Sequence, residues 1–255
     1  MTQQEIQAKI EELGPWFYEF DFGNGLRTRS SVPPAVTQIF ETRLQMVNSV
    51  ITEHFGQRLQ EISCVDVGCH EGFYTVAMAR LGIPKVLGVD VRSNNLRKAR
   101  FVAERFGFAN IDFRQSNCEK LEVEEIGRRE LTLFLGVLYH LENPMLCLRN
   151  ISSITSELCI VETQVIEEVE GETEWGSREW TRPYQGVCAM IDESGEFYAD
   201  NTETGSTPLA MCPSPKALTF MLKQAGFCRV EILLPPPGAY EQHARGKRVV
   251  CAAYK

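Results

Sequence analysis

Residues able to hold a nucleoside follow the first short apolar run of the chain. Ile62–Val67 is β-branched and apolar, and it overlaps the start of Asp66-Val67-Gly68-Cys69-His70-Glu71-Gly72, which opens a helical run. A strand, a glycine turn and a helix start bring backbone N–H groups to a ligand at the carboxyl edge of a sheet. Asp90 ends the next apolar run, where a carboxylate accepts hydrogen bonds from both hydroxyls of a ribose. The spacing therefore predicts a ligand that carries a nucleoside.

The composition of this turn indicates which nucleoside is bound. The dinucleotide fingerprint is G-x-G-x-x-G, and its second glycine lets the backbone approach a pyrophosphate. Here Gly68 and Gly72 form G-x-x-x-G, and Asp66 stands where phosphates would be repelled. S-adenosylmethionine (SAM) has no phosphate and carries an ammonium and a sulfonium, so Asp66 and Glu71 suit its charge. A short glycine pattern alone is a weak signal, but with Asp90 it favours SAM over NAD.

With these motifs the sequence resembles the class I SAM-dependent methyltransferases, and among them the family of the tRNA wobble-uridine carboxymethoxy methyltransferases. The resemblance also rests on Phe134–Leu141, Asn143-Pro144, Val161–Thr163, Pro213–Phe227 and an N-terminal segment, Trp16–Gly25. It covers most of residues 15–255. Residues 167–212 match poorly, so we expect substrate choice to lie there.

The resemblance implies a role for particular residues. It places Asp66, Gly68 and Gly72 around the methionine part of SAM, Asp90 on the ribose, and residues 117–119 at the adenine. Many relatives have aspartate at the place of Asn117. The predicted cofactor-binding residues are Asp66, Gly68, Cys69, Gly72, Asp90, Val91, Asn117, Cys118, Glu119, Gly136 and Val137.

Tyr139 and His140 are the candidate catalytic residues, because they follow the fourth predicted strand at the ligand edge of the sheet. A histidine with an ordinary pKa of about 6.5 is suited to taking a proton from a hydroxyl. The alternative is that His140 bonds a backbone group and Tyr139 packs on the cofactor. His70 is expected behind the turn or at the surface. The predicted substrate contacts are Trp16, Tyr18, Trp180, Tyr184 and Arg248.

Short apolar runs alternate with helical patterns along the chain, which is typical of a largely parallel sheet covered on both faces. We therefore predict an α/β, doubly wound, Rossmann-like fold, and the resemblance implies seven strands with the last antiparallel. Residues 1–58 are predicted to form an N-terminal helical and aromatic lid on a SAM-binding domain of residues 59–255. The insertion 167–212 follows the fifth strand. The predicted strands are Ile62–Val67, Val86–Val91, Ile111–Phe113, Leu131–Leu138, Leu158–Ile166, Val230–Leu234 and Val249–Tyr254.

Charge and composition narrow the function classes. The 255 residues carry a formal net charge of −8, which disfavours a basic field that gathers nucleic acid. No apolar run approaches the ~20 residues of a membrane helix, and the first residues carry no secretory pattern. The nine scattered cysteines indicate reduced thiols in the cytoplasm, and the four separated histidines give no zinc spacing, so no metal is expected.

Three functions stay open on the sequence. The favoured one is SAM-dependent methylation of a small molecule, with a hydroxyl as the preferred acceptor. The second is modification of the tRNA wobble uridine with carboxy-SAM or SAM, for which Arg248 is a possible basic partner of Tyr139. The third is a non-catalytic SAM-binding protein.

Overall fold

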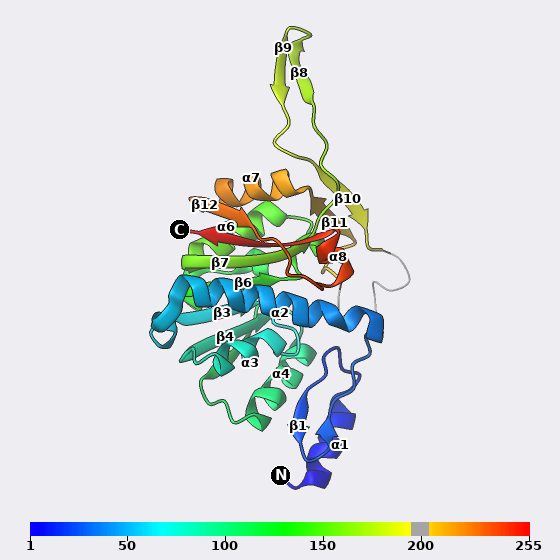
Figure 1. Cartoon of the computed structure of the whole chain (residues 1–255), viewed down its shortest axis with the longest axis vertical. Coiled ribbons are helices and arrows are strands. Elements are labelled where there is room, and N and C mark those ends of the chain that lie inside the picture. The colour runs from blue at the N-terminus through cyan, green and yellow to red at the C-terminus, as the bar shows by residue number, and fades with distance from the viewer. Residues whose placement is uncertain (195–203) are drawn as a thin grey trace. The chain divides into compact units, whose positions relative to one another are not determined.

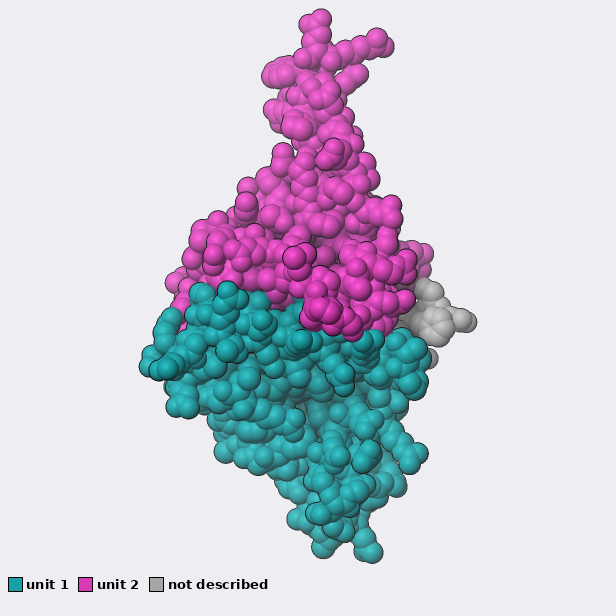
Figure 2. Space-filling view, in the orientation of Figure 1, with its two compact units in different colours: residues 1–117 teal, residues 118–255 magenta. Residues whose placement is uncertain are grey.

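The computed structural model describes residues 1–194 and 204–255, in two compact units (Figure 2). Unit 1 is Met1–Asn117 and unit 2 is Cys118–Lys255. The predicted lid, residues 1–58, lies inside unit 1, and its action as a lid stays a prediction. Residues 195–203 of the predicted insertion lie outside the described residues.

Seven strands form one sheet in the order β12-β13-β7-β6-β3-β4-β5. Unit 1 contributes β3 (Ser63–Val67), β4 (Lys85–Asp90) and β5 (Ile111–Gln115), which pair in parallel. Unit 2 contributes β6 (Arg129–Leu135), β7 (Thr155–Gln164), β12 (Arg229–Ile232) and β13 (Arg248–Tyr254). The last strand, β13, pairs antiparallel with both neighbours, and β6 and β7 are parallel. The predicted fold and all seven of its strands are therefore confirmed.

The rest of unit 1 consists of helices and one small hairpin. The helices are α1 (Gln3–Leu13), α2 (Pro34–Phe55), η1 (Gly56–Gln60), α3 (Phe73–Arg80) and α4 (Ser93–Arg105). Strands β1 (Asp21–Gly23) and β2 (Leu26–Arg27) pair through a turn that needs left-handed backbone, and Asn24 at its centre has φ 53°. Arg92, not Ser93, precedes α4 as its cap residue, and the Arg92 N–H is taken by Asp90.

Unit 2 holds the helices η2 (Cys118–Lys120), α5 (Val123–Ile126), η3 (Leu138–His140), α6 (Pro144–Ile154), α7 (Pro215–Ala225) and α8 (Glu241–Ala244). Ser214 caps α7 as its Oγ accepts the Ala217 N–H at 3.4 Å. Asn143 precedes α6 but its side chain makes no cap bond, so Pro144 alone marks that start.

The insertion of residues 167–212 forms two antiparallel ladders. One pairs β8 (Glu172–Ser177) with β9 (Trp180–Pro183), and the other pairs β10 (Cys188–Asp192) with β11 (Leu209–Pro213). The β8–β9 hairpin projects away from the sheet strands of unit 2, whereas β10 and β11 lie close to them (Figure 1). The two parts of the insertion therefore serve different surfaces of unit 2.

The core consists of the apolar strands predicted to be covered on both faces. Leu131–Leu135 of β6 and Leu158–Val161 of β7 are buried throughout. Continuous burial of this kind requires uninterrupted apolar runs, which explains their composition. No helix of the described ranges combines the length and apolar character needed to span a bilayer. All nine cysteines are free thiols; seven are buried, and Cys188 and Cys228 are exposed.

Candidate active site

The Gly68 turn of unit 1 lies between β3 and α3. The N–H groups of Gly68 and Cys69 donate to Val89 O at 2.8 and 2.9 Å, and the Gly72 N–H donates to Cys69 O at 2.8 Å. The His70 N–H donates to the Asp90 carboxylate, so four N–H groups of the turn are hydrogen-bonded inside unit 1. The expectation that they face a ligand is wrong for these four, because β4 supplies the acceptors of three and the turn itself, at Cys69 O, supplies that of Gly72. A turn with its N–H groups engaged is a poor site for a pyrophosphate.

The two glycines are required by the backbone itself. Gly68 and Gly72 have φ of 80° and 82°, which L side chains rarely adopt. A Cβ on Gly72 would lie 3.1 Å from the Ala99 Cβ, so the glycine also permits close packing of the turn on α4.

Asp90 ends β4 and organises the turn. Its carboxylate accepts the N–H groups of His70 at 2.9 Å and Arg92 at 2.8 Å, and the Asn95 amide lies at 3.4 Å. Burial raises the pKa of Asp90, and the hydrogen bonds from Arg92, His70 and Asn95 oppose part of that rise. A carboxylate has about four acceptor positions, so Asp90 retains capacity for a ribose hydroxyl. Val91 beside it is exposed.

Asp66 lies buried in β3 behind the turn. Its carboxylate accepts the Thr75 hydroxyl at 2.6 Å, and burial raises its pKa to about 7. A cation bound at this turn would favour the ionised carboxylate. The position suits the ammonium of SAM.

Glu71 has a different role from the one predicted. Its carboxylate is fully buried and accepts the N–H groups of Phe17 at 3.0 Å and Tyr18 at 2.9 Å. The Lys98 ammonium donates to it at 2.8 Å and also bonds Pro15 O. Glu71 therefore holds the N-terminal aromatic segment, and its charge is already paired.

The aromatic segment packs inside unit 1. Trp16 and Tyr18, predicted as substrate contacts, are buried; Trp16 donates to Ile10 O at 2.8 Å and Tyr18 stacks on Phe73. This placement gives both residues a packing role, and their contact with a substrate stays a prediction.

His70 is not a surface group. Both ring nitrogens are buried without a hydrogen-bond partner among the described residues, and the ring lies 4.9 Å from that of Phe17. Burial lowers the pKa of His70 to about 3, and the nearby charges of Lys98 and Arg92 act in the same direction. The imidazole is therefore neutral at ordinary pH.

In unit 2 the chain turns sharply after β6. The strand ends at Leu135, three residues before the predicted end, because Gly136 takes a φ of 74° and donates its N–H to Glu162 O at 2.9 Å. A short turn, η3, then presents Tyr139 and His140, both half-buried. Val137 is half-buried as well, whereas Cys118 is buried and accepts the Asn150 amide at 3.1 Å. Asn117 and Glu119 are half-buried.

His140 is paired with a residue that the sequence did not single out. The His140 Nδ1 lies 2.6 Å from Glu193 Oε1, and the Gly205 N–H donates to Glu193 Oε2 at 3.0 Å. Burial raises the pKa of Glu193, but the bonds from His140 and Gly205 outweigh it and hold the pKa below its usual range. Because an ionised carboxylate only accepts, Nδ1 carries the proton and Nε2 is the basic nitrogen. No hydrogen bond within the described ranges occupies Nε2.

The pairing depends on the β10–β11 ladder. Glu193 follows β10, its N–H donates to Pro208 O at 2.7 Å, and Met211 N–H donates to Leu141 O at 3.0 Å. A Cβ on Gly205 would lie only 2.1 Å from the carbonyl oxygen of His140, so only glycine fits this approach. Glu193 lies 53 residues from His140 among many glutamates, and the sequence carries no local signal for it.

Tyr139 is held by a buried charged network. Arg248 donates to the Tyr139 hydroxyl at 2.9 Å, to Glu162 at 3.0 Å and to Gln242 at 2.9 Å. Its guanidinium also lies 4.8 Å from the centre of the Tyr139 ring. Arg248 was predicted as a substrate contact, and all three of its nitrogens are engaged within unit 2.

Trp180 and Tyr184 belong to the β8–β9 hairpin and its base. Trp180 is 61% exposed, and the ring of Tyr184 covers Gly171. The ladder β10–β11, and not this hairpin, reaches His140, so substrate contact by Trp180 and Tyr184 stays a prediction. No group of three or more potential metal ligands gathers within residues 1–194 and 204–255.

A sequence profile described as "Methyltransferase domain" matches residues 60–225. The match spans more than half of the chain, and it includes the Gly68 turn, Asp90 and His140. The chain belongs to this methyltransferase family. The predicted class, a SAM-dependent methyltransferase, is therefore confirmed.

Curated relatives match the methyltransferase region over part of their length. The ubiquinone biosynthesis O-methyltransferase of Acinetobacter baylyi is 36% identical over 94 residues, 37% of this chain and 39% of the relative. The tRNA U34 carboxymethyltransferase of Campylobacter hominis is 31% identical over 96 residues, 37% of this chain and 33% of the relative. The match thus spans about two fifths or less of the length of these relatives.

Solved structures share the methyltransferase fold over the whole chain. The N-terminal domain of EvdMO1, crystallised in the presence of SAH and D-fucose, has a TM-score of 0.72 and 24% identity, covering 100% of this chain and 97% of that one. The magnesium protoporphyrin IX methyltransferase of Synechocystis PCC 6803 with bound SAH has a TM-score of 0.56 and 14% identity, covering 99% and 94%.

Proposed function

We propose that the chain is a SAM-dependent O-methyltransferase that acts on a hydroxyl group of a small molecule. The observation that carries this proposal is the pair formed by His140 Nδ1 and Glu193 Oε1 at 2.6 Å. A histidine whose Nδ1–H is held by a carboxylate presents a basic Nε2, which is the arrangement that removes a proton from a hydroxyl.

The cofactor follows from the residues of unit 1. Asp90 retains acceptor capacity for ribose hydroxyls, Asp66 offers a carboxylate to a cation, and the turn lacks free N–H groups at four positions for a pyrophosphate. These features fit a phosphate-free cationic nucleoside, and structural neighbours carry SAH. When bound, SAM supplies a methyl group activated by its sulfonium.

The chain's own part in the reaction is to remove and hold one proton. With SAM bound, the acceptor oxygen would receive the methyl group as the bond from that methyl to the sulfonium breaks and SAH is left, and His140 Nε2 would accept the hydroxyl proton. Glu193 keeps His140 in the correct tautomer and stabilises the imidazolium that results. The lowered pKa of Glu193 keeps its carboxylate ionised at neutral pH. Arg248 fixes the Tyr139 hydroxyl beside this step.

The relatives support a hydroxyl acceptor. Several are O-methyltransferases, and the N-terminal domain of EvdMO1 was crystallised with a sugar, D-fucose. We therefore take sugar and phenolic hydroxyls as the first acceptors to test. The free cysteines agree with a reducing compartment, and we assign the enzyme to the cytoplasm.

Carboxymethyl transfer to tRNA is the second candidate, because one relative carries that name. Arg248 would have to recognise the extra carboxylate of carboxy-SAM, yet its guanidinium already bonds Glu162, Gln242 and Tyr139. The net charge of −8 also disfavours an RNA face. A non-catalytic SAM-binding protein would have no use for a histidine–carboxylate pair.

The proposal is tested by transfer of a labelled methyl group from SAM to a panel of sugars and phenols, with bulk tRNA and labelled carboxy-SAM as a separate arm. We expect His140→Ala to lower turnover by about 10²–10⁴-fold and to leave SAH affinity nearly unchanged, since it removes the base and no cofactor ligand. Glu193→Gln can keep the hydrogen bond to His140 but gives up the one from the Gly205 N–H, so it should lower turnover less than His140→Ala and shift the pH profile. Wild-type turnover in His140→Ala would show that His140 is not the base. Labelling of tRNA alone would favour the second candidate.

A further inference from the structure

The β8–β9 hairpin, here called the arm (residues 172–183), carries large apolar side chains typical of a protein interface, yet these side chains are exposed. Residues 167–180 are all exposed, including Trp175 and Trp180 at 48% and 61%. A two-stranded hairpin that packs on nothing is marginally stable in water, and tryptophans are enriched where proteins meet. The arm therefore calls for a partner surface.

Side chains along the arm define its chemistry. The Thr181 hydroxyl donates to Glu172 at 2.9 Å, and the Arg182 guanidinium stacks 3.7 Å from the centre of the Trp175 ring. Arg182 is thus occupied, whereas no ion pair within the described ranges engages the exposed carboxylates of Glu174 and Glu179. With Trp180 next to Glu179, the end of the arm combines a large apolar side chain with negative charge.

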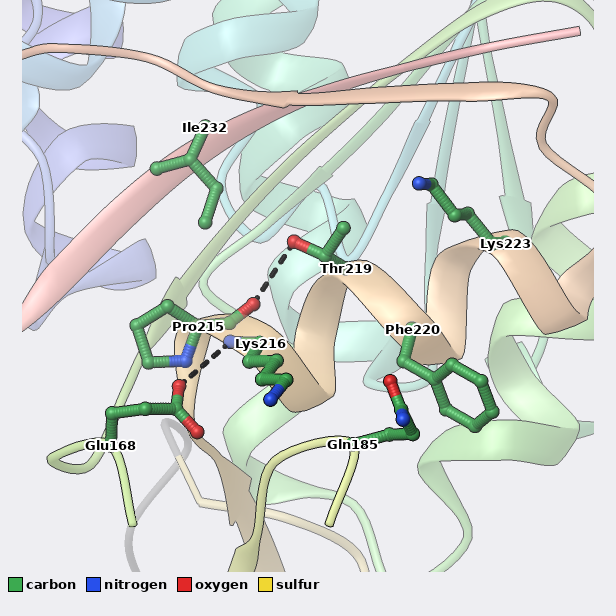
Figure 3. A pocket seen from close by; sticks show the side chains of 8 residues that line it. All are labelled: Glu168, Gln185, Pro215, Lys216, Thr219, Phe220, Lys223 and Ile232. Carbon is green, nitrogen blue, oxygen red and sulfur yellow. Dashed lines mark hydrogen bonds between the residues drawn. The ribbon is translucent and has the colours of Figure 1, made fainter. Parts of the chain in front are cut away.

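A groove of complementary character lies at the foot of the arm, on unit 2 (Figure 3). It has a volume of about 560 Å³ and is lined by Glu168, Gln185, Pro215, Lys216, Thr219, Phe220, Lys223 and Ile232. Phe220 on α7 and Ile232 on β12 are 42% and 39% exposed and face the groove as apolar walls. Lys216 and Lys223, also on α7, add positive charge. The groove thus combines apolar walls with positive charge, which complements the tryptophan and the negative charge at the end of the arm.

The foot of the arm is fixed to the same helix. Glu168 accepts the Ser214 hydroxyl at 3.0 Å and the Lys216 N–H at 2.9 Å, which ties the chain entering the arm to the start of α7. These hydrogen bonds fix the base of the arm next to the groove, and Trp180 lies at the opposite end of the arm.

We infer that two copies of this chain form a two-fold dimer in which the arm of each copy lies on the α7 groove of the other. When two arms run antiparallel about a two-fold axis, the end of each reaches the foot of its partner, so both contacts form at once and the assembly closes at two. Trp180 enters between Phe220 and Ile232, and Glu179, next to it in the turn, meets Lys216 and Lys223. A six-residue strand spans about 20 Å and an eleven-residue helix about 16 Å, so the arm is long enough to lie along α7.

Sedimentation equilibrium of the full chain from about 1 to about 100 μM tests the dimer directly, since it covers dissociation constants of that order. We expect wild-type protein to be dimeric, and Trp180→Glu to weaken the dimer at least tenfold because it places a charge between Phe220 and Ile232. Met190→Glu is the matched control: Met190 is 75% exposed and lies on β10, outside arm and groove, so the dimer should persist.

A charge exchange identifies the contact. Glu179→Lys and Lys216→Glu/Lys223→Glu should each be monomeric, and mixing them should restore a dimer, because both arm–groove contacts of the mixed pair regain opposite charges. A wild-type chain that is monomeric at the highest concentration overturns the inference. So does a dimer that survives Trp180→Glu, or two charge variants that fail to associate when mixed. All these readouts are independent of methyl transfer, so the dimer and the proposed function stand or fall separately.

Discussion

At the scale of single residues, Asp66 shows how burial prepares a group for its ligand. The carboxyl has one hydrogen-bond donor, Thr75, and burial raises its pKa to about 7, with the charge of Asp90 adding to the rise. An aspartate in an unfolded chain has a pKa near 3.9. Between about pH 4 and pH 7 Asp66 is therefore protonated in the folded protein and ionised in the unfolded chain.

This shift predicts two opposite pH dependences. The free energy of unfolding should fall as pH rises from about 4 to about 7, because over this range the folded state binds a proton at Asp66 that the unfolded chain does not. It should level off above pH 7, where both states have released that proton. SAM affinity should instead rise through pH 7, by up to about tenfold per pH unit, since the cation favours the ionised carboxylate. Asp66→Asn keeps the acceptor for Thr75 and should flatten both curves in melting and titration experiments. Unchanged curves in that variant would remove Asp66 from cofactor recognition.

Single residues were predictable where their neighbours in sequence define their role. Gly68, Gly72 and Asp90 stand at fixed places in a strand–turn–strand pattern, and the structure holds Gly68 and Gly72 at positive φ. Glu193 could not be found in this way, because it meets His140 only through the pairing of β10 with β11. Glu71 was predicted to face the charge of SAM, and its actual partners could not be predicted because they are the N–H groups of Phe17 and Tyr18, 54 and 53 residues away.

At the scale of elements, the β10–β11 ladder fixes the proposed base. Its chain returns past His140 at Gly205, where a Cβ would come within 2.1 Å of the His140 carbonyl oxygen, and the Gly205 N–H holds Glu193. The seven sheet strands were predicted correctly because buried parallel strands are continuous apolar runs. The ladder and the arm were not, because β8, β9 and β10 are short and largely exposed and the partly buried β11 pairs only with β10.

Gly205→Ala tests the ladder as a positioning element. The added methyl group should push the loop away from His140 and loosen Glu193, so turnover should fall about tenfold or more. SAH affinity should stay the same, because neither Gly205 nor the two residues it positions are among the predicted cofactor-binding residues. Kinetics and calorimetry on the same preparation separate the two effects. Ser206→Ala, an exposed neighbour, is the control and should behave as wild type. Full turnover in Gly205→Ala would show that the ladder does not position the base.

At the scale of the whole molecule, each unit carries one part of the proposed chemistry. Unit 1 holds the Gly68 turn with Asp66 and Asp90, and unit 2 holds His140 with Glu193. The α/β fold class follows from sequence pattern, and the methyltransferase class follows from the motifs that carry the resemblance. The acceptor does not, because the insertion after β7 is the part that matches the resembled family least.

The most direct test of the central claim is isothermal titration of SAH and of NAD⁺ into the wild-type chain and Asp90→Asn. We predict saturable binding of one SAH, with a Kd of about 1–100 μM, and no heat from NAD⁺, since four N–H groups of the turn are already engaged. Asp90→Asn keeps one acceptor oxygen for His70 or Arg92, places its NH2 against the other N–H, and should weaken SAH at least tenfold through the lost charge and the lost ribose acceptor. Absence of SAH binding to the wild-type chain, or equal binding of NAD⁺, would contradict the account.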